Sequence, residues 1–422
     1  MTTPDLSAAD KKPRPWTGDY VLDHFTLPAE VEQELRADFD TRREAERADS
    51  VRDRERRLAA STKPEADKPS DDVLTWTPLF DPDATCSHEL GPVVKVISAA
   101  EVDAMFAAEK LGARSSEPMD TKRAKAVCRL IASRGEYRLL GTLAEDWQLQ
   151  LDELDVQFPN FTEVIDYFRA LFNLAALHGS ERHGAVPELE PILLDGPPGV
   201  GKSYFAMTFA DMLGVPYTRL DFGSMQTGGE LTGSDAMWAN SKAGGVFKML
   251  VERDYANPVM LLDEIDKTNP NQVYNPESAL LTLLERSTST TFHDLSLPDL
   301  SINASKIIWI ATANELRRIT PAIVSRFRVF TVGRIPDSSA ASFVDKVLGE
   351  ATAGMLQPGE NFHMRASAIE IAKTLSPRIL KRTLREAAAY AYLSERTVLY
   401  EDDLLKALDG PSNAGRKRFG FG

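Results

Sequence analysis

A glycine-rich loop that ends in lysine and serine is the first feature of the sequence that could do chemistry. Residues 196–203 read GPPGVGKS and directly follow a short apolar run at 192–194. Glycines let backbone N–H groups curl around a phosphate at the start of a helix, and a strand before the loop is the context that this pattern requires. We therefore predict that the loop binds nucleotide phosphates through Gly196, Pro197, Pro198, Gly199, Val200, Gly201, Lys202 and Ser203.

The last two residues of this loop have separate predicted roles. The Lys202 ammonium can reach the β- and γ-phosphates, and the Ser203 hydroxyl can bind a Mg²⁺ ion that accompanies them. The competing interpretation is a glycine-rich turn with a purely structural role. The adjacent lysine and serine, placed after an apolar run, argue against it.

A second candidate element is the apolar run at 259–262 that ends in Asp263 and Glu264. The carboxylate of Asp263 would complete the shell of the Mg²⁺ ion together with Ser203, and Glu264 would polarise the attacking water. An apolar run that ends in two acidic residues is common by itself. Downstream of the glycine-rich loop, and in a parallel sheet, it becomes a strong prediction.

These residues need a parallel sheet to position them. From about residue 160, apolar runs of strand length alternate with helical stretches, which predicts an α/β fold with helices on both faces of a parallel sheet. The runs lie at 192–194, 217–222, 259–262, 307–311 and 329–332. After 335 the pattern is helical, at 337–350, 366–374, 377–393 and 401–408, which predicts a small all-helical lid domain.

The whole chain divides by pattern into five parts. We predict a charged, partly disordered or helical N-terminal extension at 1–75, a small mostly helical region at 76–155, the α/β nucleotide-binding core at 156–335, the helical lid at 336–409 and a flexible tail at 410–422. Arginine alternates with acidic residues in the extension, which favours a solvated helix or tether over a site. The first two parts carry no pattern that indicates chemistry.

The composition restricts the class of function. The 422 residues include 49 Lys and Arg against 63 Asp and Glu, a formal net charge of -14. This balance argues against non-specific duplex binding, which needs a basic surface. Two cysteines without a CxxC spacing argue against a disulfide framework and a zinc site. The sequence shows neither a signal peptide nor a long apolar stretch, so we expect a cytoplasmic protein without a membrane partner.

The chain resembles an AAA+ ATPase, and most closely the ATPase module of Lon protease, over about residues 155–409. The motifs that carry the resemblance are GPPGVGKS, VMLLDEIDK, PESALLTLLE followed by FHDLSL, IIWIATAN and ITPAIVSRFRVF. The resemblance implies a P-loop AAA+ fold, ATP with Mg²⁺ as the ligands, hydrolysis through the Asp263–Glu264 pair, and a homo-oligomeric ring that we expect to be a hexamer.

The resemblance also implies roles for three further residues. Asn314 matches sensor 1, which helps to orient the lytic water, although an asparagine after a strand can also be a turn residue. Arg326 matches the arginine finger, which acts on the neighbouring subunit's nucleotide, and Arg378 matches sensor 2, which reports the γ-phosphate to the lid. Rival arginines remain: Arg317, Arg318 and Arg328 lie near Arg326, and Arg382 and Arg385 follow Arg378.

The site for the nucleotide base is left open by the sequence. In related enzymes it lies between the segment just before the core and the lid. Phe158, Phe161 and Ile165 are candidates there. Packing in the hydrophobic core explains these three side chains equally well.

A glycine-bounded segment at 228–250 is the candidate for contact with a substrate. Trp238 falls where Lon-like ATPases carry an aromatic pore-loop residue that grips extended polypeptide. An aromatic face can contact a polypeptide backbone whatever its side chains. The alternative is a tryptophan buried under the loop, and Ala239 is smaller than the usual aliphatic partner.

Two classes of function fit these features. The first is a ring ATPase that remodels, unfolds or translocates a protein partner; the second is a nucleic-acid-linked AAA+ ATPase, such as a loader, a transposition regulator or a defence-system component. The acidic balance and Trp238 favour the first. A nucleotide-dependent scaffold with little turnover is a third possibility, against which Glu264 and Arg326 argue.

The end of the chain bears on peptidase activity and on partners. Residues 409–412 echo the sequence around the peptidase serine of Lon, but only ten residues follow Ser412. We therefore expect no peptidase activity of the chain's own. The segment 415–422 combines three cations with Phe419 and Phe421, and it could dock a partner or be disordered.

Overall fold

The computed structural model describes residues 74–76, 80, 91–110, 121–178, 184–225, 228–236, 241–268, 276–356 and 360–409. The predictions for residues 1–73, for Trp238 and for the tail at 410–422 lie outside these residues. Within the described part, none of the helices is long and apolar enough to cross a membrane.

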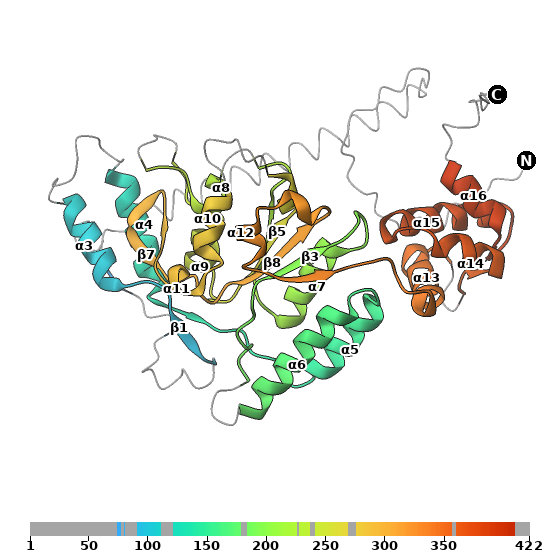
Figure 1. Cartoon of the computed structure of the whole chain (residues 1–422), viewed down its shortest axis with the longest axis horizontal. Helices are drawn as coiled ribbons and strands as arrows, with labels where there is room; N and C mark the ends of the chain where they lie inside the picture. The colour runs from blue at the N-terminus through green and yellow to red at the C-terminus, as the bar shows by residue number, and fades with distance from the viewer. Residues whose placement is uncertain are drawn as a thin grey trace, which may run out of the picture. The chain divides into compact units, whose positions relative to one another are not determined.

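A five-stranded parallel sheet forms the centre of the fold (Figure 1). Its strands are β3 (Ile192–Asp195), β4 (Tyr217–Asp221), β5 (Val259–Asp263), β8 (Ile308–Ala313) and β9 (Arg328–Thr331). They lie in the order β4-β5-β8-β3-β9, and every pairing is parallel. The predicted parallel sheet is confirmed. Because parallel strands end at the same edge, the residues that follow β3, β5 and β8 meet there.

Hydrophobic clusters cover both faces of the sheet, because alternate side chains of a strand point to opposite sides. On β3, Ile192 and Leu194 belong to one cluster and Leu193 belongs to the other. The first cluster includes side chains from α5 (Trp147–Gln157), α6 (Thr162–His178) and α7 (Lys202–Leu213). Stacked rings join α6 to α7, since the ring centroids of Phe168 and Phe209 are 4.1 Å apart.

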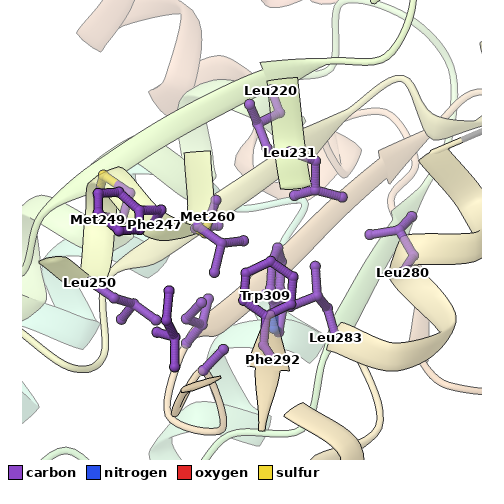
Figure 2. Packing of buried hydrophobic residues seen from close by; sticks show 14 of the residues in the cluster. Leu220, Leu231, Phe247, Met249, Leu250, Met260, Leu280, Leu283, Phe292 and Trp309 are labelled. Carbon is purple, nitrogen blue, oxygen red and sulfur yellow. The ribbon is translucent and has the colours of Figure 1, made fainter. Parts of the chain in front are cut away.

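The second cluster covers the opposite face and is shown in Figure 2. Its elements are α8 (Gly229–Thr232), α9 (Gly245–Val251), α10 (Pro276–Leu283), α12 (Pro321–Val324) and the hairpin of β6 (Phe292–Asp294) and β7 (Leu297–Ile302). The short helix α11 (Arg286–Ser289) precedes that hairpin. Trp309 of β8 lies in this cluster with Leu283 and Phe292, so the hairpin is packed onto the sheet through its apolar side (Figure 2).

The segment before α5 shares the second cluster with the sheet. Its elements are β1 (Val93–Lys95), α3 (Ala99–Lys110), α4 (Thr121–Arg134) and β2 (Tyr137–Leu139). Arg138 is only 1% exposed and donates hydrogen bonds to the carbonyls of Leu250 and Val251 at the end of α9. Burial lowers the pKa of Arg138 to about 10. The region predicted at 76–155 therefore shares a core with the sheet, and its boundary stays a prediction.

Four helices build the lid, which forms the red bundle in Figure 1. They are α13 (Asp337–Thr352), α14 (Ala366–Lys373), α15 (Pro377–Leu393) and α16 (Glu401–Asp409), and they enclose a third hydrophobic cluster. The two-residue strands β10 (His363–Met364) and β11 (Val398–Leu399) pair beside them, so the lid is not entirely helical. Arg396 holds Asp403 through two hydrogen bonds of 2.9 Å, which fixes the start of α16.

Candidate nucleotide-binding site

The glycine-rich loop connects β3 to α7 at the carboxyl edge of the sheet. Gly201 precedes α7 with a φ of 105°, and Gly199 has a φ of 84°. Residues with a Cβ rarely adopt such backbone. Gly196 has another constraint, because a Cβ there would lie 2.0 Å from the carbonyl oxygen of Val332. The geometry of the loop thus requires glycine at three positions, and the loop leads into the N-terminus of a 12-residue helix.

Lys202 lies inside the loop and is 7% exposed. Its Nζ donates hydrogen bonds to the carbonyls of Gly196 and Pro197, over 2.5 and 3.0 Å, and to Oδ1 of Asn314 over 3.0 Å. Burial lowers the pKa of the Lys202 ammonium, and the neighbouring carboxylates, Asp195 foremost, oppose that shift. The lysine is therefore held in an acidic environment beside the residue that was predicted as sensor 1.

Ser203 and Asp263, the two predicted Mg²⁺ ligands, are in direct contact. The Ser203 hydroxyl donates to Oδ1 of Asp263 over 2.7 Å, and the Thr312 hydroxyl donates to the same oxygen over 2.5 Å. Thr312 in turn accepts a hydrogen bond of 2.9 Å from the backbone N–H of Glu264. The carboxylate of Asp263 is buried, so these contacts fix its orientation. Sequence reasoning missed Thr312, which enters the site because β8 lies next to β5.

Arg219 is a second residue that sequence reasoning missed. It lies on the edge strand β4, and its Nη2 is 2.6 Å from Oδ2 of Asp263. The feature of the sequence that could have identified Arg219 is a cationic residue inside the apolar run at 217–222. Such a signal is weak, because an edge strand exposes many of its side chains.

Glu264 has an unusual backbone conformation immediately after β5. Its φ of 58° and ψ of 46° lie in the left-handed region, which costs a residue with a Cβ about 1–2 kcal/mol. Its Oε2 forms an ion pair of 2.5 Å with Nζ of Lys267, three residues further along the short 3₁₀ helix Ile265–Lys267. Strain of this kind concentrates at functional sites. The predicted water-polarising carboxylate is thus held by a lysine that the sequence alone did not single out.

A cavity of about 540 Å³ brings the site together, a size typical of small-molecule sites. It is lined by Lys202, Ser203, Arg219, Asp263, Glu264, Thr312 and Asn314 from the core and by Lys346, Arg378 and Lys381 from the lid. Arg378 is the second residue of α15. Neither Arg382 nor Arg385 is among the lining residues in the described part of the chain.

The predicted arginine finger and its rival lie elsewhere. Arg326 donates to the carbonyl of Ala322 over 2.7 Å, and its Nε is 4.0 Å from Glu285. Arg328 begins β9, and its guanidinium lies 4.5 Å from the ring centroid of Tyr167. Both arginines therefore have partners within the chain, and the side chain of Arg326 is 28% exposed. The choice of Arg326 stays a prediction.

The three residues considered for contact with the nucleotide base differ in their positions. Phe161 and Ile165 are buried in the first cluster, where Phe161 stacks on Phe205 at 4.4 Å. Core packing is therefore the explanation for these two, and Phe158 alone of the three also lines the large cavity. A smaller apolar pocket of about 120 Å³ lies between the loop and the lid, with linings that include Val200, Ile335, Phe343 and Leu380. The sequence analysis expected a base site beside the lid but did not identify these linings, because they come from segments far apart in the chain.

The fold and the site define a P-loop nucleotide-binding protein, and comparison with known proteins names its class. Residues 192–334 match the ATPase family associated with various cellular activities (AAA). This segment, which runs from β3 to just past β9, is therefore similar to an AAA ATPase domain, and the match supports an ATP-hydrolysing enzyme.

Curated relatives of the chain are Lon proteases. The Lon protease of Helicobacter pylori strain 26695 is 28% identical over 274 residues, which are 64% of this chain and 32% of the relative. The Lon protease of Porphyromonas gingivalis is 35% identical over 141 residues, which are 33% of this chain and 17% of the relative. The chain thus spans about a third or less of these relatives, and the likeness is to an ATPase module of the Lon type.

Among solved structures, the Holliday junction branch migration motor RuvB of Thermotoga maritima is similar. It has 15% sequence identity and a TM-score of 0.40, over 59% of this chain and 68% of RuvB. A likeness at this level is too distant to bear on the function.

Proposed function

We propose that this chain binds ATP with Mg²⁺ in the large cavity and hydrolyses it. The observation that carries the proposal is that two contacts, between Lys202 and Asn314 and between Ser203 and Asp263, lie in the lining of one cavity. The donor set fits Mg²⁺, since that ion takes hard oxygen ligands such as a hydroxyl and a carboxylate. When bound, Mg²⁺ would neutralise charge on the phosphate oxygens.

The residues of the chain then have distinct tasks. Lys202 and the loop N–H groups hold the phosphates. Asn314 orients the Lys202 ammonium and the attacking water relative to each other. Glu264 polarises the attacking water, which requires its carboxylate to leave Lys267. Arg378 approaches from the lid, so the relative position of lid and core would change with the nucleotide state. The small apolar pocket between loop and lid is our proposed site for the base.

We further propose that the chain works as a homo-oligomeric ring, expected to be hexameric, in which Arg326 acts on the neighbouring subunit's nucleotide. Arg326 does not line the cavity of its own chain in the described residues, which is what an arginine finger supplied in trans requires. A cytoplasmic location remains part of the same proposal.

The proposed partner is a protein. The curated relatives are named as proteases, and the net charge of -14 disfavours a polyanion. The described residues on either side of Trp238 form a neck: the Ser234 hydroxyl accepts a hydrogen bond of 2.6 Å from the backbone N–H of Lys242, and a Cβ at Gly244 would lie 2.3 Å from the backbone nitrogen of Gly233. Such a neck holds the two described ends of the segment that carries Trp238 close together.

The test is to purify the chain with Glu264→Gln, which should keep ATP bound, and to identify what it retains. ATP-dependent retention of proteins, with hydrolysis by the wild-type chain stimulated by those proteins, supports the proposal. Stimulation by DNA or RNA, with no protein retained in an ATP-dependent way, supports the nucleic-acid-linked alternative instead. Lys202→Ala serves as the control that should retain neither, since it cannot hold the phosphates.

A further inference from the structure

Arg219 places a cation inside the predicted metal site. Its Nη2 is 2.6 Å from Oδ2 of Asp263, and both residues line the large cavity. The other carboxylate oxygen, Oδ1, receives the hydroxyls of Ser203 and Thr312. One oxygen of the buried carboxylate is therefore held by neutral groups, and the other is held by a charge.

The two partners of this ion pair differ in their freedom to move. The side chain of Arg219 is 52% exposed, and it extends from an edge strand of the sheet. The side chain of Asp263 is 3% exposed and is fixed by two hydroxyls. Arginine has a long side chain with several rotamers, so Arg219 is the member of the pair that can leave.

A divalent ion and a guanidinium compete for the same carboxylate oxygen. Mg²⁺ requires near-octahedral coordination by oxygen, and two cations on one carboxylate repel each other strongly in a partly desolvated cavity. A buried carboxylate without any cation is also unfavourable. The site therefore favours one cation at a time on Oδ2 of Asp263.

We propose that Arg219 is a gate for the metal: it neutralises Asp263 when no divalent ion is present and moves away from that carboxylate when Mg²⁺ and nucleotide enter. The proposal rests on the proposed function, because it assumes that this cavity binds a nucleotide with Mg²⁺. Arg219 and Mg²⁺ would then compete for Oδ2 of Asp263.

The gate predicts how strongly Mg²⁺ strengthens nucleotide binding. The measurement is the dissociation constant of fluorescent mant-ADP, taken once in EDTA and once in excess Mg²⁺. The readout is the constant in EDTA divided by the constant in Mg²⁺. In Arg219→Met the ratio should rise about threefold to tenfold over wild type, because Mg²⁺ no longer has to displace the Arg219 guanidinium from Asp263. The Mg²⁺ concentration at half-saturation should fall by the same factor.

A matched control removes another cation from the same cavity. Lys346 lines the cavity from the lid helix α13, so Lys346→Met should weaken mant-ADP binding in both conditions and leave the ratio unchanged. Arg219→Gln keeps a donor toward Asp263 without the charge, and its ratio should also rise. It carries the test if the melting curve shows that Arg219→Met does not fold.

The contrary results are distinct. A ratio that is unchanged or lower in the Arg219 variants would show that Arg219 does not compete with Mg²⁺ for Asp263, and would overturn the gate. A rise of equal size in Lys346→Met would assign the effect to the general charge of the cavity and would also overturn it. A wild-type chain that binds no mant-ADP in either condition would contradict the proposed function itself, and the gate with it.

Discussion

The Nζ of Lys202 lies 3.0 Å from Oδ1 of Asn314, although 112 residues separate the two in the chain. They meet because β3 and β8 are neighbours in the sheet, with Asp195 opposite Ala313 at their carboxyl ends. The phosphate-binding lysine and the candidate sensor are therefore one hydrogen-bonded unit, so a change in either residue is felt by the other.

Lys202→Ala should abolish nucleotide binding, whereas Glu264→Gln should bind ATP and stall. The lysine contacts ground-state phosphate, while the glutamate acts on the water, and general-base catalysis is worth about a hundredfold or more in rate. Binding of a fluorescent nucleotide and release of phosphate separate the two effects. Near-normal turnover in Glu264→Gln would contradict the proposed site.

Arg326→Ala subunits should bind ATP and lack turnover. When they are mixed with Lys202→Ala subunits, some activity should return, because an intact Arg326 then faces an intact Lys202 at some interfaces. An arginine finger is worth roughly a thousandfold or more in related phosphoryl transfer. Arg328→Ala is the control, since Arg328 already contacts Tyr167; a larger defect there than in Arg326→Ala would reverse the assignment.

Trp238→Ala should abolish work on the protein partner and leave the melting temperature unchanged. A tryptophan that grips a substrate contributes little to the fold, whereas truncation of a buried one costs about 3–5 kcal/mol. Thermal denaturation and an assay for partner remodelling distinguish the two. A sharply lowered melting temperature would favour the buried alternative.

Asp294→Ala should loosen the neck of the loop that carries Trp238. The carboxylate is fully buried and accepts hydrogen bonds from the N–H of Gly244 over 2.9 Å and from the N–H and hydroxyl of Ser296 over 2.9 and 2.6 Å. Removing it leaves buried donors unsatisfied, at a cost of about 2–4 kcal/mol in the free energy of unfolding. His293→Ala, at an exposed position of the same hairpin, should cost much less; equal effects would contradict this role of Asp294.

The same carboxylate predicts a dependence on pH. Burial raises the pKa of Asp294 above its ordinary value of 3.8 in the folded chain. The folded state then binds this proton more tightly than the unfolded state. The contribution of protonated Asp294 to the free energy of unfolding is therefore complete below pH 3.8 and declines as the pH rises through the raised pKa. Asp294→Asn cannot titrate. The stability of wild type relative to Asp294→Asn, measured by urea denaturation, should therefore fall as the pH rises through this range, and a constant difference would contradict the prediction.

The local elements of the site could be predicted from the sequence. The glycine-rich loop with Lys202 and Ser203 is a contiguous pattern, and its context of strand, loop and helix is set by neighbours in the chain. Asp263 ends an apolar run whose length identifies a buried strand. Asn314 and Arg378 were identified through the resemblance to AAA+ ATPases, and the structure places both at the cavity. Their roles stay predictions.

The tertiary structure alone decided which side chains complete the site. Arg219 and Thr312 contact Asp263 because β4 and β8 lie on either side of β5. Phe161 was assigned to the core by its stacking on Phe205 across two helices, and Arg138 by its contacts with the end of α9. Hydrophobic periodicity shows that a strand is buried, but it leaves open which strand lies beside it and in which register. Contacts between residues that are distant in the chain depend on that order, so they follow only from the packed sheet.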